Sequence, residues 1–253
     1  MKHLVYLLIP FVFLSCRNVF PKRDVPVLST EKLDTIQSLP PVTATPAILE
    51  TAFIKGTTHT TVNDKTFYLY GINIGKLKIT SGRLIACDPL HVDEYGIPFT
   101  QVFPTGEFPV QLSIAKLDKE ESIAFARISF SDEPVVRWEF ALQAGQQPMA
   151  VGSKKMHGFS VDGGTALFMD ETGKKVLDRK TVEDMDAAVF KEMDKHYHFD
   201  WRYALYNFGD HNLAAFSTGF GDGYFGTYIG FDAAGKPCRF VTDFNVVDWK
   251  QKK

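Results

Sequence analysis

Apolar and polar side chains alternate along several short stretches of this chain, and this alternation constrains the fold more than any other feature. From Phe108 to Lys116, the residues Val110, Leu112 and Ile114 alternate with smaller or more polar ones. A period of two residues is typical of a strand that buries one face. Similar stretches, bounded by turn-forming residues, predict further strands: Phe67–Tyr70, Arg83–Cys87, Ile123–Phe130, Trp138–Ala141, Tyr203–Asn207, Leu213–Ser217, Gly223–Phe231 and Pro237–Phe244.

One segment has the character of a helix. Thr181 is suited to an N-cap, Asp184 follows three residues later, and apolar residues then recur at three- and four-residue spacing up to Tyr197. By contrast, Gly71 to Lys78 shows no regular pattern. The 22 phenylalanines suit a pleated, half-buried surface. The sequence therefore predicts a mostly β or α+β fold, an antiparallel sheet or sandwich with one main helix at about residues 181–197.

The first residues have the features of a secretory signal. A basic start that includes Lys2 precedes the apolar run Leu4–Phe13, and Leu14-Ser15-Cys16 closes it. The run is too short for the ~20 residues that a membrane-spanning helix needs. A cysteine at this position resembles a bacterial lipobox, in which the signal is cleaved and the cysteine is acylated. We therefore expect residues 1–15 to be a lipoprotein signal peptide, and Cys16 to carry acyl chains such as palmitate that hold the protein on a membrane.

The chain after the signal divides by composition into a tether and a folded part. Residues 16–47 are rich in Pro, Ser and Thr and show little periodicity, so they cannot bury enough apolar surface to fold. We expect a flexible tether there and a single globular domain over residues 48–253. The expected location is the bacterial cell envelope, and Arg17, in place of an aspartate after Cys16, favours the outer membrane.

Charge and cysteine content exclude some classes of protein. The formal net charge is −2 and no basic block exceeds three residues, so the electrostatic footprint of a nucleic-acid-binding protein is missing. No CxxC pair is present. Apart from Cys16, the chain contains Cys87 and Cys238. An oxidising compartment allows a disulfide between these two, and two separately buried thiols are the alternative.

Glycines and aspartates cluster in three segments and near the end of the chain. The aspartates are Asp88, Asp162, Asp170, Asp222 and Asp243, and the glycines beside them are Gly163, Gly164, Gly221 and Gly223. Asp-Gly between apolar strands is a strong hairpin signal, because glycine accepts a positive φ and aspartate hydrogen-bonds its own backbone. The first interpretation of these residues is therefore that they form turns.

A functional interpretation of the same aspartates is also open. If strand ends bring several carboxylates together, they would suit a hard cation such as Ca²⁺, which takes six to eight oxygen ligands. They would also suit a general acid–base pair. No EF-hand spacing and no G-x-S-x-G nucleophile motif is present. Ca²⁺ is thus the one cofactor that the sequence suggests.

The same segments carry a resemblance to a known family. Ser81–Pro89, Phe108-Pro109-Val110, Gly158–Asp170, Gly219–Tyr228 and the terminal Val-Thr-Asp-Phe are similar to a bacterial family called domain of unknown function 4241. The resemblance covers roughly Gly71 to Phe244, and the Gly-x-Gly-Asp-Gly-Tyr block is its most specific part. It implies that this region is one domain, and it implies no activity.

These observations favour a non-enzymatic role at the cell envelope. We expect an accessory or protective lipoprotein that binds an unknown protein or small-molecule partner. The aromatic run Tyr224, Phe225, Tyr228 and Phe231 is either ordinary strand material or a recognition face. Two alternatives remain: a hydrolase or Ca²⁺-binding protein that uses the aspartates, and an immunity-type protein that neutralises a toxin.

Overall fold

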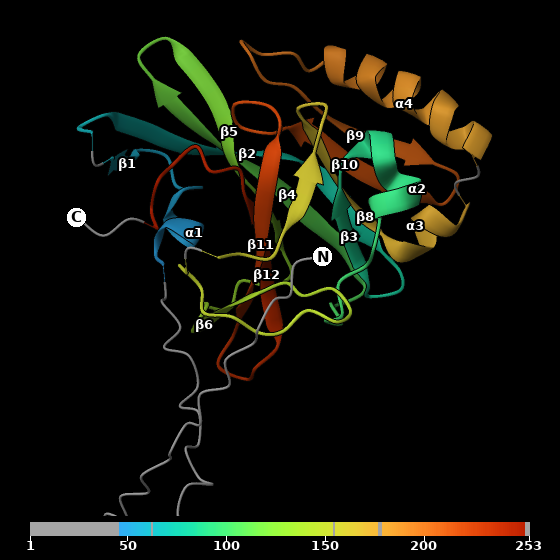
Figure 1. Cartoon of the computed structure of the whole chain (residues 1–253), viewed down its shortest axis with the longest axis horizontal. Helices are drawn as coiled ribbons and strands as arrows, with labels where there is room; N and C mark the ends of the chain where they lie inside the picture. The colour runs from blue at the N-terminus through green and yellow to red at the C-terminus, as the bar shows by residue number, and fades with distance from the viewer. Residues whose placement is uncertain (1–45, 62, 154, 177–178, 251–253) are drawn as a thin grey trace, which may run out of the picture. The chain divides into compact units, whose positions relative to one another are not determined.

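The largest element of the molecule is an antiparallel sheet that curves into a half-barrel (Figure 1). The computed structural model describes residues 46–61, 63–153, 155–176 and 179–250. The strands of this first sheet are β1 (Thr57–Thr60), β2 (Thr66–Ile79), β4 (Gly106–Leu117), β5 (Glu120–Ser129), β6 (Arg137–Phe140), β7 (Phe159–Val161), β11 (Gly223–Phe231) and β12 (Pro237–Asp243). Their spatial order is β1-β2-β4-β5-β12-β11-β6, and β7 pairs with the first residues of β11.

A second antiparallel sheet has the order β3-β8-β10-β9. Its strands are β3 (Leu84–Cys87), β8 (Thr165–Asp170), β9 (Tyr203–Phe208) and β10 (His211–Ser217). The helices are α1 (Ile48–Thr51), the 3₁₀ turn η1 (Pro89–His91), α2 (Val92–Tyr95), α3 (Glu171–Val176) and α4 (Arg179–Asp194). The prediction of a mostly β, antiparallel fold with one main helix is confirmed. Among the described residues, no helix is long and apolar enough to cross a bilayer.

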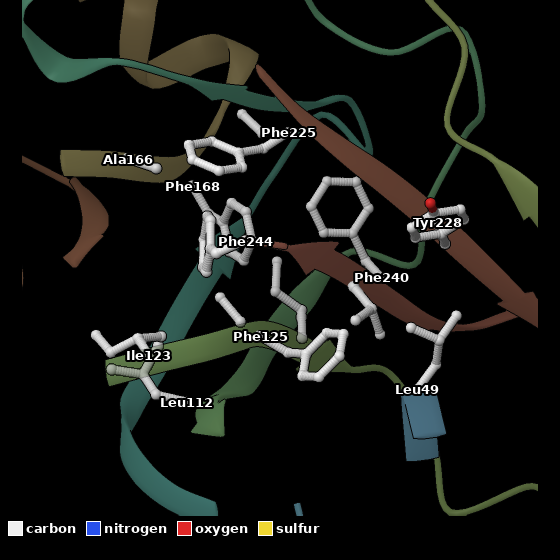
Figure 2. Close-up of a cluster of buried hydrophobic side chains, with 14 of the residues drawn as sticks. Leu49, Leu112, Ile123, Phe125, Ala166, Phe168, Phe225, Tyr228, Phe240 and Phe244 are labelled. Atoms are coloured by element: carbon white, nitrogen blue, oxygen red, sulfur yellow. The ribbon is translucent and has the colours of Figure 1, made fainter. Parts of the chain in front are cut away.

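Apolar side chains fill the space between the two sheets (Figure 2). Phe168 of β8 packs edge-on against Phe240 of β12, with ring centroids 5.1 Å apart, and against Phe216 of β10 at 4.9 Å. A separate cluster lies between the second sheet and α4, where Met169 packs with Met193. Every residue of β8 is buried, and its apolar side chains alternate between the two clusters: Ala166 and Phe168 belong to the first, Leu167 and Met169 to the second.

Most predicted strands agree with the structure within a few residues, and two local predictions were wrong. Gly71 to Lys78 is regular strand within β2, with a bulge between Asn73 and Gly75 that obscures its alternation. Thr181 is not an N-cap, because α4 begins at Arg179. The predicted apolar spacing of this helix does place Val189 and Met193 in the core.

The short helix α1 is fixed to the first sheet by a buried side chain and by two ion pairs. Leu49 has no exposed surface. The carboxylate of Glu50 lies 3.2 Å from the guanidinium of Arg127 on β5 and 3.1 Å from that of Arg239 on β12. The Arg127 guanidinium also lies over the ring of Phe53, 3.9 Å from its centroid. The start of the described chain is therefore part of the core.

Candidate functional site

The five aspartates singled out by the sequence do not converge on one point. Asp88, Asp162 and Asp222 lie around the β7–β8 turn, Asp170 lies at the end of β8, and Asp243 lies at the end of β12. Asp88 follows β3 and caps η1, since its Oδ1 accepts a hydrogen bond from the nitrogen of Leu90 at 2.8 Å. Its Oδ2 accepts one from the nitrogen of Asp162, also at 2.8 Å. The buried Asp88 carboxylate therefore serves main-chain donors.

A second aspartate, Asp222, also holds the turn between β7 and β8. Asp222 Oδ1 accepts a hydrogen bond from the nitrogen of Gly164 at 2.9 Å. Gly164 and Gly221 have positive φ angles of 60° and 113°, as a turn role for glycine predicts. Gly163 and Gly223 do not have positive φ angles. A Cβ on Gly163 would lie 2.9 Å from Leu90, and one on Gly223 would lie 2.7 Å from the ring of Phe225, so close packing explains these two glycines.

Asp170 holds the segment between β2 and β3. Its carboxylate accepts hydrogen bonds from the nitrogens of Thr80, Ser81 and Thr172, at 3.0 to 3.1 Å, and from their hydroxyl groups. Burial by itself would raise the pKa of this carboxyl. The hydrogen bonds from Thr172 and Ser81 outweigh burial and hold the pKa of Asp170 below its usual range. Asp170 is an ionised structural anchor.

Asp243 holds the C-terminal residues in the same way. Its Oδ1 accepts a hydrogen bond from the nitrogen of Asn245 at 2.9 Å. Its Oδ2 lies 2.9 Å from both the indole nitrogen of Trp249 and the ammonium of Lys250. Across the described ranges, no group of three or more His, Cys, Asp or Glu residues is arranged to hold a metal ion. The aspartates thus act as turn and cap residues here, and the Ca²⁺ hypothesis finds no site among them.

The two described cysteines lie on different sheets. Cys87 is on β3 and Cys238 on β12, and both are buried with free thiols. The disulfide that the sequence allowed is therefore not formed in this structure. Burial raises the pKa of both thiols, which keeps them protonated. Cys16, the expected acylation site, lies outside the described residues.

A cleft of about 500 Å³ opens between the η1–α2 segment and β7, and we call it the β7 cleft. One wall consists of His91, Tyr95 and Ile97. The rings of His91 and Tyr95 are 5.5 Å apart. Tyr95 and Ile97 expose 47% and 45% of their surface, a large fraction for side chains of this size. A hydrogen bond to Glu94 raises the pKa of the Tyr95 phenol, so it is neutral at physiological pH.

The other wall of the β7 cleft is formed by β7 and its neighbours. It includes Gly158, Phe159, Ser160 and Asp162, and Tyr224 completes the lining together with Gln143. The nitrogen of Gly158 donates a hydrogen bond to the phenol oxygen of Tyr224 at 2.9 Å. Aromatic faces, hydroxyl groups, an amide and one carboxylate therefore share a single concave surface.

Only part of this cleft could be found from sequence. The sequence singles out Asp162, both as a turn residue and as a member of the candidate functional aspartate cluster, and Tyr224, within an aromatic run. Tyr224 is 43% exposed, whereas Phe225, Tyr228 and Phe231 are buried, so one member of the run suits recognition and three serve the core. The η1–α2 residues were missed, because a short helical turn between two strands has no periodic signal.

A second polar cluster, also missed, surrounds Glu121 at the start of β5. Its carboxylate accepts hydrogen bonds from the hydroxyl of Tyr70 at 3.0 Å and the indole nitrogen of Trp201 at 3.4 Å. Lys116 and His198 lie 3.4 and 3.5 Å from its oxygens. Burial and the neighbouring Glu121 raise the pKa of Tyr70 to about 12. Both carboxylate oxygens of Glu121 have partners. Because these partners come from the first sheet and from the segment after α4, the cluster joins that segment to the sheet.

Comparison with known proteins gives one match. A family model described as "Protein of unknown function (DUF4241)" matches residues 77–242. This range includes β3, η1, α2 and β7 and so contains all the lining residues of the β7 cleft. No curated protein and no solved structure matches the chain.

Proposed function

The chain belongs to the DUF4241 family, and we propose that it is a lipid-anchored protein of the bacterial cell envelope that binds a ligand in the β7 cleft. The role is that of a binding or accessory lipoprotein and not of an enzyme. The observation that carries the binding role is the cleft itself. Its volume of about 500 Å³ lies in the range of ligand sites, and such sites combine aromatic walls with a few polar groups.

The envelope location is supported by the first residues of the chain. The apolar run Leu4–Phe13 followed by Leu14-Ser15-Cys16 has the order of a lipoprotein signal. Two or three acyl chains on Cys16 would hold the protein on a membrane almost permanently, at about 0.8 kcal/mol for each buried CH₂ group. Arg17 supports the outer membrane as the destination.

A hydrolase is less well supported by the cleft. His91, Ser160 and Asp162 all line it, and these residue types form catalytic triads elsewhere. A nucleophile must be hydrogen-bonded to its base, and the base to a third group. Within the described ranges, no hydrogen bond joins the side chains of these three residues. The aromatic side chains of the cleft are exposed, and these three residues are not joined into a proton relay. The cleft is therefore better suited to ligand binding than to hydrolysis.

The anchor can be tested by metabolic labelling. Cells that produce the full chain are fed an alkyne analogue of palmitate, and the membrane and soluble fractions are compared with those of the Cys16→Ser variant. We expect label in the membrane fraction of the wild type and none in the variant. Equal labelling of the two proteins, or no label in either, contradicts the anchor.

The cleft can be tested by thermal unfolding of the full chain with amines, sugars, amino acids and short peptides. A ligand of the native state at ~100 times its Kd adds about 2.7 kcal/mol, which shifts Tm by several degrees. We expect Tyr95→Ala, on the cleft wall, to abolish the shift. Tyr68→Ala is the matched control, because Tyr68 is a 57% exposed tyrosine of β2 outside the cleft. A shift that both variants retain contradicts the site.

A further inference from the structure

We propose that the β7 cleft binds a neutral saccharide. The sugar ring packs on an exposed tyrosine face, and its hydroxyl groups hydrogen-bond to the side chains of Ser160, Asp162 and Tyr224. This inference rests on the binding function proposed for the cleft, and it names the class of ligand.

Side chains, and not a strand edge, recognise the ligand in this cleft. The main-chain nitrogen of Gly158 donates to the phenol oxygen of Tyr224 at 2.9 Å, and that of Asp162 donates to the carboxylate of Asp88 at 2.8 Å. Both ends of the outer edge of β7 are therefore occupied, so an extended peptide cannot add there as a further strand. The two bonds also hold Tyr224 and the main chain of Asp162 in position, which lowers the cost of ordering them on binding.

The charges at the cleft do not select an ion. Among the described lining residues, Asp162 is the one carboxylate and there is no lysine or arginine. The ammonium of Lys174 donates a hydrogen bond to the carbonyl oxygen of Gly96 at 2.8 Å, between the lining residues Tyr95 and Ile97. One negative and one positive group therefore accompany the cleft, and this arrangement gives a ligand with a net charge no advantage over a neutral one.

Several polar side chains of the cleft can form further hydrogen bonds. In the described part of the chain, the Ser160 hydroxyl and the Asp162 carboxylate have no protein partner, and both residues are exposed. The phenol of Tyr224 accepts a main-chain hydrogen bond, so its proton remains available to a ligand. The amide of Gln143 donates to a main-chain carbonyl at 3.3 Å, and its oxygen can still accept. This mixture of donors and acceptors matches the hydroxyl groups of a saccharide, which both donate and accept.

The tyrosines supply the apolar part of a sugar-binding site. Tyr95 and Tyr224 expose 47% and 43% of their surface and line the same cleft. The face of an aromatic ring is electron-rich, and a pyranose ring presents C–H groups on its faces. An entirely apolar ligand would remove water from the polar groups of the cleft and form no hydrogen bond in return. A saccharide satisfies the aromatic and the polar groups together.

The test applies the full chain to a glycan array. The array carries neutral glycans together with sialylated, sulfated and amino-sugar analogues of the same structures. We expect at least one neutral glycan to bind, and its charged analogues to bind no more tightly. Among analogues that each lack one hydroxyl group, at least one should bind about tenfold more weakly.

The same saccharide free in solution then distinguishes two sources of the ligand. If the free saccharide competes with the immobilised glycan, a soluble sugar is sufficient for binding. If only the immobilised glycan binds, the ligand is part of a longer glycan, such as those of the cell envelope. Both results support a saccharide site.

Variants at Asp162 locate the site and separate a hydrogen bond from a charge. Asp162→Leu removes the acceptor and should weaken binding of the neutral glycan at least about tenfold. Asp162→Asn keeps one acceptor oxygen without the charge and should lose no more than about threefold. Asp132→Leu is the matched control, because Asp132 is an exposed aspartate outside the cleft, and it should change binding little. Circular dichroism checks that each variant is folded.

Four results would overturn the proposal. They are no binding of any neutral glycan, a charged analogue that binds more than about tenfold more tightly, a loss in Asp162→Asn as large as in Asp162→Leu, and equal effects of Asp162→Leu and Asp132→Leu. An amine or amino acid that shifts Tm through Tyr95, with no glycan bound, overturns the saccharide inference, and the binding function of the cleft then stands. If no probe shifts Tm and no glycan binds, both fail.

Discussion

The carboxylate of Asp88 accepts a hydrogen bond from the main-chain nitrogen of Asp162 at 2.8 Å, across 74 residues of sequence. Asp88 also caps η1, which leads into one wall of the β7 cleft, while Asp162 follows β7 in the other wall. One buried carboxylate therefore joins the two walls.

Asp88→Asn should destabilise the protein and weaken ligand binding in the cleft. The amide that replaces one oxygen cannot accept a hydrogen bond, so either Leu90 or Asp162 loses its partner, at a cost of about 1–3 kcal/mol. Urea unfolding measures this change. Asp222→Asn is the control, because its single bond to Gly164 is exposed and its loss should cost less than about 1 kcal/mol. Equal costs for the two variants would refute the role of Asp88.

Asp170→Asn should lower stability at neutral pH and reduce its pH dependence. The pKa of Asp170 in the folded state lies below its unfolded value of about 3.9, so ionisation stabilises the fold above that pH. This contribution is lost as the pH falls through the folded pKa. The difference in unfolding free energy between wild type and variant should therefore be constant from about pH 7 to 5 and shrink below about pH 4. A difference that is independent of pH down to the acid limit would contradict this.

Gly158→Ala should disrupt the pairing of β7 with β11. An added Cβ would lie 2.2 Å from the carbonyl oxygen of Phe225, and main-chain atoms cannot move aside as a flexible side chain can. We expect a loss of about 3 kcal/mol or more, measured by urea unfolding. Gly145→Ala meets open space and should cost only the strain of its φ of 86°, about 1–2 kcal/mol. The test is whether Gly158→Ala lowers the free energy of unfolding by more than Gly145→Ala does.

Thiol counting should separate buried from acylated cysteines. Cys87 and Cys238 are buried, and burial raises the pKa of each thiol, so neither should react with a disulfide reagent in the native protein. In guanidinium, protein purified from membranes should show two reactive thiols of its three cysteines, because Cys16 is acylated in the proposal. Three reactive thiols would contradict acylation, and none would indicate a disulfide.

The hairpin of β4 and β5 was predictable because large apolar side chains alternate with small or polar ones along both strands, even though both faces are buried at Leu112–Ala115 and Ile123–Ala126. β8 was not, since both of its faces are covered and Thr165–Asp170 becomes a continuous buried run. β7, with three residues, is too short to show a period. The aspartate and glycine positions pointed to turns, and Gly164 and Gly221 have positive φ angles. Their grouping could not be read from sequence, because it depends on how strand ends far apart in the chain are placed.

The attachment of α1 has a mechanical consequence. A pull on the main chain ahead of Pro46 would reach α1 before any strand. To yield, the chain must draw Leu49 out of the core and separate Glu50 from Arg127 and Arg239 at nearly the same time. Under the proposed lipid anchor, traction on the N-terminus would thus act first on these contacts of α1 with β5 and β12, and the hydrogen-bonded ladders of the half-barrel would bear no load until the contacts break.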